Sequence, residues 1–188
     1  MQVETLDIRR LSDADAWAIA ELLVRVWPDS PKKVAVRFQQ LLDLGCGYTG
    51  DDAHAPRSFV LREGGRVVAH AAILPRTIGA STGALTIAGL TRVVTDPDQR
   101  GRGLGVLVVR AAFALVDAGD FPFSLFQTTP EVRPFYEKLG ACMVDNPIVN
   151  SLEDGNLHTS PFKDKAIMRY PSSGPWPSGE IDLRGPGY

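Results

Sequence analysis

The hydrophobic positions near the start of the chain follow the period of a helix. Over residues 12–27 apolar side chains recur every three or four positions, which predicts an amphipathic helix. Ser12 or Asp13 is the predicted N-cap, and Pro28 ends the segment. A second helix is predicted over residues 31–45, with proline at its first position and glycine at its end. The buried face predicted for the first helix consists of Trp17, Ala20, Leu23, Val24 and Trp27.

Beyond residue 56 the apolar residues change to the runs and alternation of β-strands. Two β-rich runs flank Gly64 and Gly65, a pair that predicts a hairpin turn between them. The turn sequence GASTG leads into a third strand, which Pro97 ends. The order predicts an α/β or α+β domain in which helices cover one sheet. Later elements are predicted as a helix at 104–118, a strand at 121–129, a short helix within 130–140, and strands within 141–146 and 165–171.

Composition and charge restrict the class of protein. The chain has 188 residues, of which 44% are hydrophobic, and a net charge of −2. These values are typical of one soluble globular domain. The slight acidity disfavours nucleic acid held by bulk positive charge, although a local basic groove is compatible with it. No apolar run reaches the roughly 18 residues of a membrane helix, and the first residues carry no export signal. We therefore expect a cytoplasmic protein without a membrane or nucleic-acid partner.

The cysteines and histidines predict no metal centre. The two cysteines, Cys46 and Cys142, lie far apart and are expected to be reduced thiols. The three histidines, His54, His70 and His158, are equally scattered, and no spacing is that of a metal site. His70 falls in a strand-like run, so we expect a packed or hydrogen-bonded side chain there rather than a catalytic one.

The candidate chemistry lies in a glycine-rich turn between a strand and a helix. Its residues are Arg100, Gly101, Arg102, Gly103, Leu104 and Gly105. A strand, a glycine turn and a helix in this order direct backbone N–H groups and the helix dipole at an anion. Glycine lets phosphate oxygens approach the backbone, and arginine adds positive charge. The spacing is neither that of a Walker A loop nor that of a dinucleotide fingerprint.

Two motifs of the chain resemble those of one enzyme superfamily. Arg100, Gly103 and Gly105 match the pattern Arg/Gln-x-x-Gly-x-Gly/Ala and resemble motif A of the GNAT N-acetyltransferases. RPFYEKLGA, residues 133–141, is similar to their motif B. The resemblance implies the GNAT fold, a central mixed and mostly antiparallel sheet flanked by helices, over residues 1–170. It also implies acetyl-CoA as co-substrate, with the pyrophosphate held by residues 100–105.

The same resemblance assigns roles to single residues. Tyr136 is the expected general acid, because a phenol stays protonated at neutral pH and donates to a departing thiolate. The strand before the turn is expected to splay from its neighbour, so that the pantetheine arm and the thioester carbonyl meet its backbone N–H groups. The residues expected to contact coenzyme A besides the turn are Val93, Val94, Thr95, Thr128 and Thr129.

The glutamate that many family members use as general base has no counterpart here. The strand before the turn contains no carboxylate until Asp96. Deprotonation of the acceptor then runs through ordered water and backbone carbonyls, or through a base from elsewhere, or is not needed because the amine is already neutral. Thr91 is the candidate for orienting such a water, although a strand threonine is also an ordinary structural residue.

Residues 171–188 are rich in proline and glycine, which predicts an irregular arm. This arm and the run VVAHAAILPRTI resemble aminoglycoside 2′-N-acetyltransferases, and the arm also resembles nodulation acyltransferases. That resemblance implies an arm folded back beside the acceptor site, with Trp176, Asp182 and Tyr188 as candidates for contacting the acceptor. Trp176 is equally explained as an anchor of the arm to the core. The strand before the turn lacks the acidic residues that recognise a polycationic aminoglycoside.

These features predict direct transfer of an acetyl group from acetyl-CoA to an amine of a small molecule. Two alternatives stay open at this point. One is transfer of a longer acyl chain, and the other is a sensor that binds acetyl-CoA without catalysis, which the missing glutamate favours. Because dimers are common in the superfamily, a homodimer is one expected assembly.

Overall fold

The computed structural model describes residues 1–152 and 160–188, so His158 lies outside the described residues. The chain forms two compact units. The first contains Met1–Leu74 and Thr91–Ala114, and the second contains Pro75–Leu90 and Leu115–Tyr188. Three elements contribute residues to both units: β3 (Arg66–Ala80), β4 (Gly83–Thr95) and α3 (Leu104–Asp117).

The first unit is built on a sheet in the strand order β1, β2, β3, β4. β1 (Glu4–Asp7) and β2 (Arg57–Glu63) are antiparallel, as are β2 and β3. Gly64 and Gly65 form the turn between β2 and β3 with φ of 56° and 79°, which confirms the predicted hairpin. Both values are left-handed, as a tight two-residue turn requires. Short 3₁₀ helices occupy Ile8–Arg10, Asp52–His54 and Pro97–Gln99.

Helix α1 (Asp13–Val26) begins where the capping pattern predicts. Its N-cap is Ser12, whose side-chain oxygen accepts a hydrogen bond from the backbone N–H of Asp15 at 3.1 Å. The predicted buried face is partly wrong, because Trp17 is 44% exposed and Trp27 38% exposed. The buried face predicted from periodicity is rotated by about one position from the observed one, because the prediction placed these large aromatic residues inside. The residues of α1 that are buried are Ala16, Ile19, Ala20, Leu22 and Leu23.

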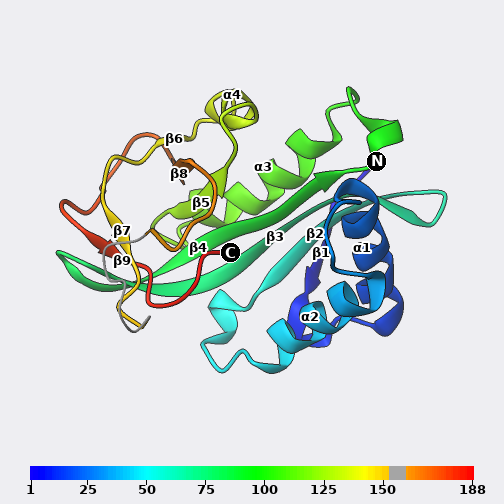
Figure 1. Ribbon diagram of the computed structural model, residues 1–188, viewed down its shortest axis with the longest axis horizontal. Coiled ribbons are helices and arrows are strands. Elements are labelled where there is room, and N and C mark those ends of the chain that lie inside the picture. The colour runs from blue at the N-terminus through cyan, green and yellow to red at the C-terminus, as the bar shows by residue number, and fades with distance from the viewer. Residues whose placement is uncertain (153–159) are drawn as a thin grey trace. The chain divides into compact units, whose positions relative to one another are not determined.

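Helix α2 (Val34–Cys46) starts three residues later than Pro31 and continues past Gly45. In Figure 1 it lies beside α1, and the two helices are in contact. Gly45 was predicted to stop the helix, and this prediction is wrong. The residue is buried inside the helix, where a Cβ atom would lie 2.4 Å from the carbonyl oxygen of Ile8. Its glycine is therefore explained by close packing and not by helix termination.

The core of the first unit joins both helices to the sheet. Side chains of α1 and α2 pack on one face of β2, β3 and β4 in one buried cluster. Its members are Ile19, Leu22, Leu23, Leu41, Val60, Val67 and Val94. Val94 thus anchors the end of strand β4 in the core, shortly before the glycine-rich turn.

The second unit has strands in the order β3, β4, β5, β8, β6. β4 runs parallel to β5, with Ala88 opposite Ser124 and Gly89 opposite Leu125. β5 and β8 are antiparallel, as are β6 and β8. β9 pairs with β3 in antiparallel and with β7 in parallel direction. The elements are β5 (Ser124–Thr128), α4 (Arg133–Glu137), β6 (Cys142–Met143), β7 (Ile148–Val149), β8 (Ala166–Tyr170) and β9 (Ile181–Asp182).

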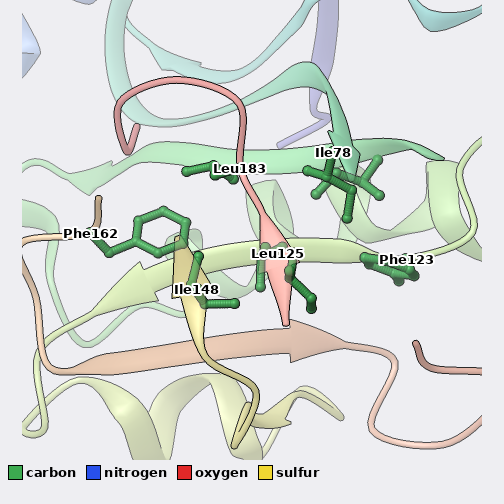
Figure 2. Packing of buried hydrophobic residues seen from close by; sticks show 8 residues of the cluster. Ile78, Phe123, Leu125, Ile148, Phe162 and Leu183 are labelled. Carbon is green, nitrogen blue, oxygen red and sulfur yellow. The ribbon is translucent and has the colours of Figure 1, made fainter. Parts of the chain in front are cut away.

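Residues 171–188 contribute to the core of the second unit. Ile181 and Leu183 are fully buried and pack with strand residues such as Ile78 and Leu125. Figure 2 shows Leu183 of this segment in the same cluster as Phe123, Ile148 and Phe162. The two-residue strand β9 adds backbone pairing. Apart from Ile181 and Asp182 the segment is irregular, as its proline and glycine content predicts, but one side of it is buried.

The predicted fold class is confirmed: helices flank a mixed sheet in which most neighbouring strands are antiparallel. Within residues 1–152 and 160–188, no helix is long and apolar enough to cross a membrane.

Candidate functional site

The glycine-rich turn lies in the first unit between the end of β4 and the start of α3. Gly101 and Gly103 have φ of 80° and 75°, a left-handed conformation that other residues adopt at a cost. A Cβ atom added at either glycine would have no neighbour within 4 Å. The space above this backbone is therefore open to a ligand.

The backbone N–H groups of the turn are available as donors. Within the described residues, those of Arg100 through Gly103 make no hydrogen bond of ordinary geometry to a backbone or side-chain acceptor. The N–H groups of Leu104 and Gly105, the first two of α3, are likewise without an acceptor, whereas those of the next two residues donate to the carbonyl of Gly103. Free N–H groups at the N-terminus of a 14-residue helix form a site for phosphate oxygens. The residues of the turn thus fit a pyrophosphate.

The arginines of the turn differ in their surroundings. Arg100 is exposed and forms no ion pair with a described residue, so its charge is available to an anion. Arg102 donates to Glu63 of the β2–β3 hairpin, with 3.0 Å between Nη2 and Oε1. This bond lowers the pKa of Glu63 and compensates part of the Arg102 charge. Of the two predicted cationic residues, Arg100 is the better placed for phosphate.

Asp96 anchors the turn to the rest of the first unit. It is 2% exposed and forms ion pairs with Arg25 of α1 and Arg66 of β3, both at 3.1 Å. Its Oδ1 also accepts the backbone N–H of Asp98 at 3.0 Å, which caps the 3₁₀ helix Pro97–Gln99. The first carboxylate after the strand is thus engaged by two cations.

A cavity of about 500 Å³ lies beside this anchor. α1 and the β2–β3 hairpin line it, and its charged groups are Glu21, Arg25, Arg66 and Asp96. Since three of these four pair with one another, the cavity presents little free charge. None of the predicted site residues lines it.

The last residues of β4 contain an unusual backbone conformation. Arg92 has φ of 52°, which is uncommon for a residue with a side chain and marks local strain. His70 of β3 donates its Nδ1 hydrogen to the carbonyl of Arg92 at 2.8 Å. Because a carbonyl only accepts, Nε2 of the neutral ring accepts the hydroxyl of Ser58 at 3.0 Å. This network holds the backbone directly before Val93.

His70 is confirmed as a hydrogen-bonded structural residue. It and Ser58 are 0% exposed, and burial lowers the pKa of His70 to about 4. The ring is therefore neutral near pH 7. Thr91, Val93 and Thr95 are half-buried on either side of this network, while Val94 is in the core. Their predicted contacts with substrate and coenzyme remain predictions.

Tyr136 lies on α4 in the second unit and is 5% exposed. Its ring packs against Phe126 and Phe135, with centroid distances of 4.7 Å and 4.9 Å. Burial raises the pKa of its hydroxyl, so the phenol is protonated at neutral pH. Within the described chain, no hydrogen-bond acceptor engages this hydroxyl. Both properties suit the general acid that the motif predicts.

The two threonines predicted near coenzyme A differ in burial. Thr128 is the last residue of β5 and is buried, opposite Ala166 of β8. Thr129 is exposed, and its carbonyl accepts the N–H groups of Val132 and Arg133 at 3.1 Å and 3.0 Å. Thr129 thereby begins the turn that carries Tyr136.

The three acceptor-side candidates of the arm have structural partners. Trp176 packs on Phe123 at a centroid distance of 4.6 Å, and its indole N–H donates to Asn146 at 2.6 Å. Asp182 accepts the backbone N–H and the hydroxyl of Ser151. The hydroxyl of Tyr188 donates to the carbonyl of Leu125 at 2.7 Å. These contacts explain the residues as anchors of residues 171–188, and their role toward an acceptor stays a prediction.

The described residues form no evident metal site. Among the described residues, no three His, Cys, Asp or Glu side chains form a group that could hold an ion. Cys46 and Cys142 are free thiols.

Sequence reasoning missed the roles of Asp96, Ser58 and the conformation of Arg92. The aspartate before Pro97 was a recognisable capping signal, since it precedes a proline at the first helical position. The left-handed Arg92 had no signal in the sequence, because arginine is not a residue that marks this conformation.

The chain matches a known family over most of its length. The family described as the acetyltransferase (GNAT) domain matches residues 7–144. The chain therefore belongs to the GNAT acetyltransferase family, as its two motifs predicted. No curated protein sequence matches it significantly.

Solved structures of similar fold extend over nearly the whole chain. A GNAT family N-acetyltransferase from Escherichia coli, in complex with CoA, has a TM-score of 0.64 at 15% identity over 96% of this chain and 88% of its own. A GNAT family acetyltransferase from Brucella melitensis, in complex with acetyl-CoA, has a TM-score of 0.61 at 14% identity over 96% and 95%. These likenesses show the fold.

A GCN5-related N-acetyltransferase from Kribbella flavida has a TM-score of 0.57 at 19% identity and matches 76% of this chain. The chain spans only about a third of that protein, 33% of its length. The similarity therefore covers one domain of that longer protein.

Proposed function

We propose that this chain is an acetyl-CoA-dependent N-acetyltransferase that moves an acetyl group directly to the amine of a small molecule. The observation that carries the proposal is the glycine-rich turn. Its left-handed glycines, free N–H groups and open space lie at the N-terminus of α3, within the region that matches the GNAT family. Relatives of the same fold that bind CoA and acetyl-CoA support the choice of co-substrate.

On this proposal each group has one role in the reaction. The N–H groups of residues 100–105 and the Arg100 side chain bind the pyrophosphate. Backbone N–H groups of Val93, Val94 and Thr95 polarise the thioester carbonyl, which favours attack by a neutral amine. As the amine nitrogen bonds to the carbonyl carbon and the carbon–sulfur bond breaks, Tyr136 gives its proton to the thiolate.

Deprotonation of the acceptor has no carboxylate on β4 to perform it, since Gly83–Thr95 contains none. Asp96, directly after the strand, is held by Arg25 and Arg66 and is not free to act as a base. Water relayed by backbone carbonyls is the route that these residues favour.

The test is acetyl-CoA binding by calorimetry, followed by release of free thiol against a panel of amines. Gly103→Asp adds a side chain and a negative charge above the turn, so binding should be lost. Gly64→Asp is the matched control, because Gly64 also has positive φ and open space around its Cβ position but lies in the hairpin.

The outcomes separate the alternatives. Binding that Gly103→Asp abolishes and Gly64→Asp preserves, with turnover of some amine, is expected. Faster turnover of longer acyl-CoA donors would favour the acyltransferase alternative, and binding without any thiol release would favour a sensor. Absence of acetyl-CoA binding would refute the proposal.

A further inference from the structure

Two arginines of the first unit have side chains that repel one another. Arg37 belongs to α2, and Arg92 belongs to β4 at its left-handed position. Leu41, one helical turn after Arg37, and Val94, two residues after Arg92, pack in the same buried cluster. Burial and the positive charge of Arg37 together lower the pKa of Arg92 to about 10. Two elements far apart in the sequence thus bring two cationic groups within interaction range.

Neither guanidinium has an acidic partner among the described residues. Arg37 stacks over the ring of Trp27 with its central carbon 5.3 Å from the centroid, and its Nη2 donates to Ser30 Oγ at 3.2 Å. Its Nε is buried without an acceptor. Arg92 forms no salt bridge or side-chain hydrogen bond to any described residue.

A third polar group lies on the same face of α2. Gln40 follows Arg37 by three residues, and its Oε1 is buried without a hydrogen-bond partner. Residues three apart on a helix are neighbours on its surface. α2 therefore carries an unsatisfied donor, Arg37 Nε, and an unsatisfied acceptor, Gln40 Oε1, at neighbouring positions.

Such an arrangement is unfavourable unless a ligand completes it. A charged group removed from water is stable only when it is paired and hydrogen-bonded, and unsatisfied buried groups are rare in folded proteins. Two guanidinium groups with unused donors match the chemistry of an anionic ligand.

The position of Arg92 points to the acceptor side of the reaction. On the proposed function, on which this step rests, the pyrophosphate lies at residues 100–105 and the thioester at Val93–Thr95. β4 runs toward the turn, so Arg92 lies on the far side of the thioester from the pyrophosphate. On this proposal Arg92 is therefore the residue of β4 beside which the acceptor amine must arrive.

We propose that Arg37 and Arg92 bind the carboxylate of the acceptor, which makes the acceptor an amine that carries a carboxylate, such as an amino acid. A planar carboxylate accepts two parallel N–H bonds from a guanidinium. A phosphate monoester suits this position less, because its second charge is costly to desolvate and no glycine turn offers N–H groups there. Two unpaired arginines repel a polycation, so an aminoglycoside is disfavoured as acceptor.

The experiment compares amines that differ only in charge. Alanine, leucine, glutamate and phenylalanine are each assayed with acetyl-CoA beside their carboxamides, together with phosphoethanolamine and the aminoglycoside kanamycin. We expect at least one amino acid to be acetylated with a kcat/KM about 10- to 100-fold above that of its carboxamide, since two charge-assisted hydrogen bonds are lost.

Substitutions then test the two arginines. Arg37→Gln and Arg92→Gln should each bring the ratio between acid and carboxamide close to one, mainly through KM, while acetyl-CoA affinity is retained. Arg110→Gln is the matched control, because Arg110 is an exposed arginine of α3 in the same unit and its loss changes the net charge equally. Arg37→Gln alone is sufficient if Arg92→Gln does not fold.

A binding measurement gives a readout independent of turnover. Calorimetry of the CoA-loaded protein should show binding of the N-acetyl derivative of the preferred amino acid, weakened about tenfold or more in Arg37→Gln. Equal kcat/KM for acids and carboxamides, a preference for phosphoethanolamine or kanamycin, or no binding of any amino acid or acetylated product would overturn the inference. If acetyl-CoA itself binds in these cases, the proposed function stands and only the acceptor class is wrong.

Discussion

Replacing Gly45 tests the structure, because the structure and the sequence alone predict stability changes of opposite sign. Glycine inside a helix is unfavourable, so Gly45→Ala should stabilise α2 if the site were open. In the structure the added Cβ atom would lie 2.4 Å from the carbonyl oxygen of Ile8 and 3.0 Å from the Cα atom of Arg9. Both neighbours belong to the backbone of the 3₁₀ helix Ile8–Arg10, which has no alternative rotamer.

The two effects have opposite signs. Helix propensity favours alanine by about 1 kcal/mol. Overpacking costs typically about 1–3 kcal/mol, and its upper end applies because backbone atoms must move. The net expectation is a loss of about 2 kcal/mol in the free energy of unfolding, and for a chain of this length about 4–8 °C in melting temperature.

Thermal unfolding followed by circular dichroism measures the change. Gly47→Ala is the control, because Gly47 has an ordinary helical backbone at the end of the same helix and would contact only the helix's own Asp43 carbonyl. This control should be unchanged or slightly stabilised. A Gly45→Ala protein at least as stable as the wild type would show that α2 does not approach Ile8 as closely as described.

Three further changes test the site. Asp96→Asn removes the negative charge that pairs with both Arg25 and Arg66. Since both arginines are about half exposed, we expect the free energy of unfolding to fall by about 1–2 kcal/mol and acetyl-CoA binding, measured by calorimetry, to weaken. An unchanged stability and an unchanged affinity would contradict the anchoring role of Asp96. Because the pKa of His70 is about 4 when folded and about 6.5 when unfolded, the unfolded chain binds the extra proton between these values, so stability should fall by up to about 3 kcal/mol from pH 6.5 to pH 4. Urea titrations across this range should show a shallower fall for His70→Gln, and parallel curves would argue against a neutral buried ring. Tyr136→Phe keeps the aromatic packing but removes the acidic proton, so kcat should drop roughly 10²- to 10⁴-fold with acetyl-CoA affinity unchanged, and full turnover at every pH would exclude Tyr136 as the acid.

Local features of the fold were predictable from the sequence. The Gly64-Gly65 hairpin, the Ser12 cap and the start of α3 at Leu104 all match the structure. Each depends on the conformation of a few neighbouring residues, such as the left-handed φ that glycine tolerates. The GNAT family was equally accessible, because the motifs around Arg100–Gly105 and Tyr136 are contiguous in the chain.

The short strands β1, β7 and β9 were not predictable. Each has two to four residues, too few to show a period, and each exists only because a distant strand supplies its hydrogen bonds. The same is true of residues 171–188, whose Ile181 and Leu183 are buried against strands from other parts of the second unit.

The chemistry around β4 likewise depended on tertiary structure. The residue types at 37, 70 and 92 carry no pattern that relates them, since they belong to a helix and two strands. Only folding makes His70 donate to the carbonyl of the left-handed Arg92, and only folding lets Arg37 lower the pKa of Arg92. The sequence by itself determined the family and the glycine-rich turn, because these are local in the chain. The surroundings of Arg37 and Arg92 were decided only by folding, because charges interact through space and not along the sequence.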